Sequence, residues 1–320
     1  MPRDKLRLFN GVEMHDEPAR SQPVFLSSGD VIADRRFAHA ADYMAGDDAR
    51  AAHDLLTQTL ELAPHWPAAW FALGEACLAL GWQEKARAAF GRALAAAPED
   101  ALGASLKLAQ LGVMPPAPAP EAYVKRLFDG YADRFESHLV GRLAYRGPRL
   151  MADAIAGLGR TRFARAIDLG CGTGLCGEIF RARVQHLAGV DLAPRMIARA
   201  KAKGIYDHLA VGSLERFLAD EAAASADLLL AGDVLIYIAD LAPLFAAAFR
   251  VLRSGGLFAF TVQTAESGFL LGKDLRYAHA AGYIRDVAAN AGFTLRVLEN
   301  AAARQEAGSD VPGLVAVLEK

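Results

Sequence analysis

The sequence predicts two domains: an all-α domain near the N-terminus, followed by an α/β domain built on a mostly parallel sheet. Two observations carry this prediction. A pattern of small and apolar residues recurs with a period of 34 residues in the first third of the chain, and apolar runs of strand length alternate with helical segments after residue 164. Between them lies MPPAPAP (114–120), where four prolines in seven residues predict a stiff, extended spacer.

These patterns set the expected domain boundaries. They are an arm over 1–32 with little periodicity, a helical repeat domain over 33–112, a linker over 113–120 and the α/β domain over 121–320. Either domain is long enough to bury its own core.

Residues 67–100 are similar to a tetratricopeptide repeat, a pair of closely packed helices. The positions that carry the resemblance hold Trp70, Leu73, Gly74, Ala86, Phe90, Ala93 and Pro98. Cys77 replaces the usual tyrosine, a weaker copy covers 33–66, and 101–112 is expected to cap the stack. Two copies and a cap bury little apolar surface by themselves, so we expect this domain to lean on the second domain or on another subunit.

The composition is that of an ordinary globular protein, with 53% hydrophobic and 22% charged residues. A net charge of −2 argues against a nucleic-acid partner, because no general field attracts phosphates. The three cysteines are too few for a disulfide framework and lack metal-ligand spacing. Neither a signal peptide nor an apolar run of membrane-spanning length is visible, so we expect a cytoplasmic protein with no membrane contact.

The segment after the linker, 121–158, is expected to be helical. Tyr123, Leu127, Tyr131 and Phe135 recur at four-residue spacing and form one apolar-aromatic stripe. The stripe indicates a helix that faces the core. A second interpretation stays open, in which Tyr131, Phe135 and Tyr145 also roof a cofactor pocket.

From residue 164 onward, strand-like and helical segments alternate, which is typical of a parallel sheet covered on both faces. The strand-like runs are AIDLG (166–170), HLAGVDL (186–192), DHLAVGS (207–213), ADLLLAGDVL (226–235) and GLFAFTVQ (256–263). The helical segments are 175–183, 194–203, 214–222, 240–252 and a last one near 279–290. The final runs, FTLRVLEN (293–300) and GLVAVLEK (313–320), are joined too closely for a crossover helix and are expected to pair antiparallel.

A glycine-rich turn follows the first strand-like run and precedes the first helix of the sheet. Such a turn binds anions and adenosine cofactors, because glycines let a ligand approach the backbone closely. Gly172, Gly174 and Gly177 have the spacing of a dinucleotide site, which alone is weak evidence. Asp191, at the end of the second strand, would bind ribose hydroxyls for a nicotinamide dinucleotide and for another adenosine cofactor alike.

Four further motifs separate these possibilities. DLGCGTG (168–174), GVDLAPRMI (189–197), DLLLAGDVLIYIADL (227–241) and VLRSGGLFAFT (251–261) together resemble class I S-adenosylmethionine-dependent methyltransferases. The resemblance implies a Rossmann-like sheet of seven strands with an antiparallel terminal strand, S-adenosyl-L-methionine as cofactor, and S-adenosyl-L-homocysteine as product. With FDGYADRFESHL (128–139), YRGP (145–148) and RYAH (276–279), the chain looks like a bacterial family of methyltransferases with tetratricopeptide repeats.

The resemblance also implies which residues bind the cofactor. Asp168 would face the methionine ammonium, Asp191 the ribose, and Leu192 and Leu214 the two faces of the adenine. Ser213 stands where many relatives carry an aspartate that accepts the adenine amino group; a neutral acceptor is weaker there. The full set of expected cofactor residues is Asp168, Gly170, Cys171, Gly172, Gly174, Asp191, Leu192, Met196, Ser213, Leu214, Asp233, Tyr131 and Tyr145.

Catalytic candidates are fewer, because a sulfonium is already activated and the protein mainly aligns the reactants in a dry site. Asp233 and Tyr237 follow the fourth strand and are expected near the methyl group, with Asp233 as a base, a holder of a substrate amine, or only a turn cap. His279 could act as a general base, or only cap a helix. Arg276 could clamp a carboxylate, or only lie on the surface.

Several functions therefore remain open. The first is methyl transfer to an O or N of a small molecule. The second is methylation of a protein that the repeats bind, and the third is a catalytically silent S-adenosylmethionine-binding scaffold. A dehydrogenase is the weakest. No metal is expected, and the oligomeric state, including a homo-oligomer, stays open.

Overall fold

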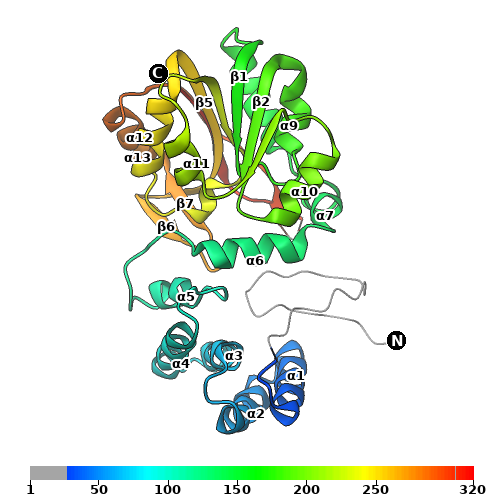
Figure 1. Cartoon of the computed structure of the whole chain (residues 1–320). Coiled ribbons are helices and arrows are strands. Elements are labelled where there is room, and N and C mark those ends of the chain that lie inside the picture. Colours follow the sequence, from blue (N-terminus) through cyan, green and yellow to red (C-terminus); the bar gives the residue numbers. More distant parts are fainter. Residues whose placement is uncertain (1–26, 307) are drawn as a thin grey trace. The chain divides into compact units, whose positions relative to one another are not determined.

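The computed structural model describes residues 27–306 and 308–320, and most of the predicted N-terminal arm lies outside these residues. The chain divides into two compact units (Figure 1). One extends to Tyr123 and includes Leu271–Leu275; the other comprises Val124–Leu270 and Arg276–Lys320. No helix in the described ranges is long and apolar enough to cross a membrane.

The N-terminal unit is helical. Its helices are α1 (Val31–Ala45), α2 (Ala49–Leu62), α3 (Pro67–Ala79), α4 (Gln83–Ala96) and α5 (Ala104–Gln110). α1 packs against α2, α3 packs against α4, and α5 follows. Asp30 and Asp48 cap the first two helices through their side chains. A Cβ on Gly74 would lie 2.6 Å from the fully buried ring of Phe90. The glycine therefore lets α3 and α4 approach closely, as the repeat pattern predicts.

The second unit is built on a mostly parallel sheet with the strand order β3-β2-β1-β4-β5-β11-β8. Its strands are β1 (Phe163–Leu169), β2 (Val184–Asp191), β3 (His208–Val211), β4 (Ala226–Ala231), β5 (Leu252–Ala265), β8 (Thr294–Asn300) and β11 (Gly313–Glu319). β11 runs antiparallel to both of its neighbours, β5 and β8. The predicted Rossmann-like sheet and its terminal antiparallel pair are confirmed.

Two short strands extend this sheet beyond the prediction. β6 (Phe269–Leu271) pairs with β7 (Tyr277–Ala280), and β7 pairs in parallel with the last residues of β5. The sequence predicted a last helix near 279–290 and no strand before it, which was wrong for Tyr277–Ala280. The reason is the length of β5: its pairing with β4 ends at Phe260, so Gln263 and its successors have an edge free for β7.

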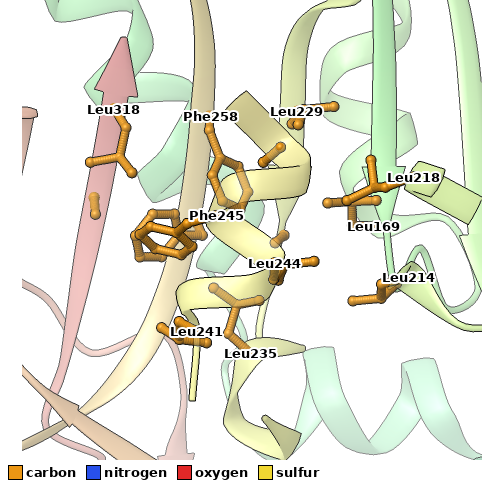
Figure 2. Close-up of a cluster of buried hydrophobic side chains, with 14 of the residues drawn as sticks. Leu169, Leu214, Leu218, Leu229, Leu235, Leu241, Leu244, Phe245, Phe258 and Leu318 are labelled. Carbon is orange, nitrogen blue, oxygen red and sulfur yellow. The ribbon is translucent and has the colours of Figure 1, made fainter. Parts of the chain in front are cut away.

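Helices cover both faces of the sheet (Figure 1). They are α8 (Gly147–Gly157), α9 (Leu175–Phe180), α10 (Pro194–Ala202), α11 (Leu214–Asp220), α12 (Ala242–Val251) and α13 (Ala281–Asn290). Figure 2 shows one of the two cores, where α12 lies over β4 and β5. Phe245 meets Phe258 edge-on with 5.5 Å between ring centroids, and both rings are fully buried. Each such ring contributes about 1.5–3 kcal/mol, so this core fixes the strand ends that carry the site.

The segment before the sheet is helical, as predicted, but broken. α6 (Glu121–Tyr131) and α7 (Phe135–Gly141) precede α8, and the loop 142–146 separates α7 from α8. Asp133, between α6 and α7, pairs with Arg195 and Arg199 of α10, both at 2.6 Å. Figure 1 accordingly shows α7 beside α10.

Candidate active site

A glycine turn joins β1 to α9 at the carboxyl edge of the sheet. Gly170, Gly172 and Gly174 all have positive φ, between 54° and 97°, where other residues are strained. A Cβ on Gly170 would collide with Val234, which follows β4. The turn therefore needs glycines both for its backbone conformation and for its close approach to the neighbouring strand end.

Asp168 stands just before this turn and is fully buried. Its Oδ2 accepts a hydrogen bond of 2.6 Å from the hydroxyl of Tyr206, whereas its Oδ1 has no hydrogen-bond partner among the described residues. Burial raises the pKa of Asp168 to about 7. A buried carboxylate oxygen without a partner is costly, and a cationic ligand group would satisfy it.

Tyr206 precedes β3 and was missed by the sequence analysis. A Cβ on Gly177 would lie 2.5 Å from its hydroxyl, and a Cβ on Gly189 would lie 2.9 Å from its ring. The third glycine of the dinucleotide spacing therefore makes room for a tyrosine ring, not for a cofactor. The signal in the sequence is that glycines occupy positions 174, 177 and 189, because such small residues leave space that one large side chain can fill.

Asp191 ends β2 and is half-buried. Its carboxylate accepts hydrogen bonds from the backbone N–H groups of Gly172 (2.9 Å) and Ala193 (2.8 Å). Burial raises the pKa of Asp191. The carboxylate thus ties the end of β2 to the glycine turn, and each oxygen keeps a further lone pair for a ligand hydroxyl.

The expected adenine residues lie around the same edge. The N–H of Gly212 donates to the backbone carbonyl of Asp191 at 3.0 Å, which brings Ser213, the residue before α11, next to the end of β2. Leu192 is half-buried, whereas Leu214 is buried.

Two other expected cofactor residues have packing partners. Met196 is fully buried beneath Phe128 and Phe135. Cys171 directs its sulfur toward β2, where a Cβ on Gly189 would lie 3.0 Å away. Both side chains are therefore packed inside the protein near the glycine turn.

Aromatic residues from α6 to α8 lie over the strand ends. A Cβ on Gly172 would lie 3.7 Å from the ring of Phe135, which meets Tyr131 edge-on with 5.4 Å between centroids. The Tyr145 hydroxyl would lie 2.9 Å from a Cβ on Gly232, the residue after β4. The three rings therefore lie around the strand ends, and their role as the roof of a cofactor pocket stays a prediction.

Asp233 and Tyr237 follow β4, next to the glycine turn. Asp233 has φ 57°, unusual outside glycine, and its N–H donates to the hydroxyl of Thr261 at 2.9 Å. Its carboxylate accepts a hydrogen bond of 2.7 Å from the guanidinium of Arg304. Tyr237 is buried against Phe128, with 5.6 Å between ring centroids.

Arg304 and Glu306 complete a charged cluster that the sequence analysis missed. Arg276 contacts Glu306 at 2.7 Å, and the Nε of Arg304 contacts the same carboxylate at 3.2 Å. Arg276 is therefore paired in this cluster rather than lying on the surface. The sequence signal was faint: an Arg and a Glu two residues apart in a connection that was read only as a short loop.

His279 does not have the placement of a general base. It lies in β7, is fully buried, and its Nε2 contacts the backbone carbonyl of Ile238 at 3.0 Å. Burial lowers the pKa of His279 to about 4. The imidazole contacts the backbone carbonyls of Ile238 and Ala239 through Nε2 alone, which favours a structural role. The alternative that His279 caps a helix is wrong, because the N-cap of α13 is Ala280.

Comparison with known families agrees with this architecture. Residues 167–260 match the methyltransferase domain family, and residues 67–100 match the tetratricopeptide repeat family. The chain contains a class I, S-adenosylmethionine-dependent methyltransferase domain. The match covers β1 to β5 of this methyltransferase domain, including the glycine turn, Asp191 and Asp233.

Relatives of the methyltransferase domain include two named enzymes. The chain is 32% identical over 120 residues to a malonyl-acyl-carrier-protein O-methyltransferase of Enterobacter lignolyticus, which is 37% of this chain and 47% of the relative. It is 31% identical over 113 residues to a ubiquinone biosynthesis O-methyltransferase of Xylella fastidiosa, 34% of this chain and 46% of the relative. The chain thus spans about half the length of the curated relatives it matches.

One solved structure similar to this domain is the 1,6-didemethyltoxoflavin-N1-methyltransferase of Burkholderia thailandensis. The identity is 20% and the TM-score 0.49, with 65% of this chain and 93% of that chain covered.

Proposed function

We propose that the chain is an active methyltransferase that transfers a methyl group from S-adenosylmethionine to an O or N of a small molecule. One observation carries the proposal: Asp168 is fully buried at the glycine turn, and its Oδ1 has no partner within the described part of the chain. A ligand ammonium would pair with this oxygen. A nicotinamide dinucleotide has no cationic amine to offer there.

The other groups of the cofactor would find partners at the same edge of the sheet. The lone pairs left on Asp191 would accept the ribose hydroxyls, and Ser213 would accept the adenine amino group. Half-buried Leu192 would contribute apolar contact to the adenine. When bound, the cofactor supplies an electrophilic methyl carbon on a positively charged sulfur.

The residues of this chain would then catalyse by alignment and by exclusion of water. Phe135 and Tyr145 cover the strand ends, and Asp133 fastens this roof to α10. Burial raises the pKa of Tyr131 to about 12, so this hydroxyl, which pairs with His138 Nδ1, stays protonated and does not act as a base. Asp233 is ion-paired and His279 is buried, so neither is placed to remove a proton from the acceptor. We therefore expect an acceptor atom that is nucleophilic without the help of a base.

A second function has one observation in its favour. The tetratricopeptide unit has a mostly apolar cavity of about 270 Å³, lined in part by Trp70, Lys85 and Arg92. Such a cavity suits a side chain of a protein partner, which would make the repeats a delivery site for a protein substrate. A silent scaffold would bind the cofactor without turnover.

Calorimetric titration tests the cofactor assignment. We expect S-adenosylhomocysteine to bind and NAD not to bind. Asp168→Asn should weaken S-adenosylhomocysteine by about 10–100-fold, the equivalent of a charged hydrogen bond of about 1.5–3 kcal/mol. Asp153→Asn, on an exposed position of α8, is the matched control. Binding of NAD alone, or equal affinities for the two variants, would overturn the assignment.

A screen for turnover tests the acceptor class. The protein is incubated with S-adenosylmethionine and either a metabolite mixture or a protein lysate, and release of S-adenosylhomocysteine is measured. Turnover with metabolites supports the small-molecule proposal. Turnover with the protein fraction alone would favour the second function, and binding without any turnover would favour the scaffold.

A further inference from the structure

The connection between β8 and β11 carries a buried arginine to the carboxyl edge of the sheet. The N–H of Gln305 donates to Leu143 O at 2.7 Å, and the N–H of Arg146 donates to Ala303 O at 2.8 Å. These bonds fix the backbone on both sides of Arg304 against the loop before α8. Its side chain is only 2% exposed.

The guanidinium of Arg304 is only partly satisfied. One terminal nitrogen, Nη1, donates to Asp233, and Nε contacts Glu306. The other, Nη2, is buried and has no hydrogen-bond partner among the described residues. A guanidinium stays charged at any physiological pH, so its unused N–H groups call for an acceptor.

This unused nitrogen belongs to the edge of the sheet where the acceptor is expected. Asp233, to which Arg304 donates at 2.7 Å, follows β4 at its carboxyl end, two residues after Ala231. Tyr145 lies at the same strand end: its hydroxyl would lie 2.9 Å from a Cβ on Gly232, the residue before Asp233.

We infer that Arg304 binds a carboxylate of the methyl acceptor through Nη2. This inference rests on the proposed function and narrows its substrate class to small molecules that bear a carboxylate. The two arginines and two carboxylates of the cluster, Arg276, Arg304, Asp233 and Glu306, are formally neutral together. An anionic acceptor would therefore balance the positive sulfonium of the cofactor, and a planar carboxylate matches the guanidinium geometry.

Thermal unfolding of the S-adenosylhomocysteine complex tests this inference. Acetate, succinate and benzoate are each added, at constant ionic strength, to the full chain saturated with S-adenosylhomocysteine, and each is compared with its uncharged amide. We expect at least one carboxylate to raise the unfolding temperature and its amide not to. Arg304→Lys, which keeps a charge beside Asp233, should abolish the carboxylate effect yet bind S-adenosylhomocysteine within about twofold of wild type.

The outcomes separate the two proposals. If S-adenosylhomocysteine does not bind the wild type, the proposed function fails. If it binds but no carboxylate is preferred over its amide, the inference fails alone. An unchanged carboxylate effect in Arg304→Lys also overturns it.

Discussion

Removing one hydroxyl from Tyr206 tests how the ammonium site is built. Tyr206→Phe leaves the ring between Gly177 and Gly189 but deletes the 2.6 Å hydrogen bond to Asp168. Burial holds the pKa of Tyr206 well above its usual range, so the hydroxyl donates throughout the accessible pH range. A hydrogen bond to a charged group contributes about 1.5–3 kcal/mol, so its loss should raise the pKa of Asp168 by about 1–2 units from its value of about 7.

The consequence is a shift in the pH dependence of ligand binding. The ammonium pairs only with the ionised carboxylate, so affinity falls as the pH drops through the pKa of Asp168. For wild type this loss should centre near pH 7, and for Tyr206→Phe it should begin about 1–2 units higher. Calorimetric titration of S-adenosylhomocysteine between about pH 6 and 10 measures both midpoints.

A matched control separates this effect from general loss of structure. Tyr43→Phe removes the hydroxyl of an exposed tyrosine in α1 and should leave the profile unchanged. A variant that is merely misfolded would lose affinity equally at every pH. The reasoning is refuted if Tyr206→Phe keeps the wild-type midpoint, since the hydroxyl would then contribute nothing to the charge state of Asp168.

Three further substitutions probe the rest of the site. Asp191→Ala removes both the ribose acceptor and the tie to the glycine turn; we expect calorimetry to show at least about a 10-fold loss of S-adenosylhomocysteine affinity, and an unaltered dissociation constant would remove the ribose assignment. Gly177→Ala overpacks the Tyr206 ring and should lower the free energy of unfolding by about 1–3 kcal/mol in urea titration; no change would mean that the ring can move aside. Asp233→Asn leaves Arg304 with only the 3.2 Å contact to Glu306 and should destabilise the fold by about 3–5 kcal/mol. Loss of a general base typically lowers turnover by about 10²–10⁴-fold, and we expect a smaller loss here. A loss of that size with a shifted pH profile would show that Asp233 is the base.

The parallel sheet was predictable because its signals are local. Buried parallel strands read as continuous apolar runs, and AIDLG or ADLLLA needs no knowledge of its neighbours to be recognised. The terminal antiparallel pair followed from the short connection between its strands. β7 was not predictable in this way, since it depends on how far β5 extends beyond β4.

The polar partners of the site could not be predicted, because they are set by tertiary contacts. Tyr206 reaches Asp168 across 38 residues, and Arg304 reaches Asp233 across 71. A sequence motif identifies only one residue of each pair, Asp168 or Asp233. The glycine pattern shows the limit best: Gly177 fits a dinucleotide fingerprint in the sequence, yet in the fold it accommodates a tyrosine ring.

The pairs Tyr206–Asp168 and Arg304–Asp233 leave groups of opposite charge at the two ends of the site. At the β1 end, a buried carboxylate keeps one oxygen for a cation; at the β4 end, a buried guanidinium keeps one nitrogen for an anion. The backbone of Asp233 is held at φ 57° so that its carboxylate meets Arg304, and Asp tolerates this conformation better than most residues. A site that fixes a cationic donor at one end and an anionic acceptor at the other aligns them by charge. Catalysis by such alignment needs residues that bind the donor and the acceptor, and it does not need a general base.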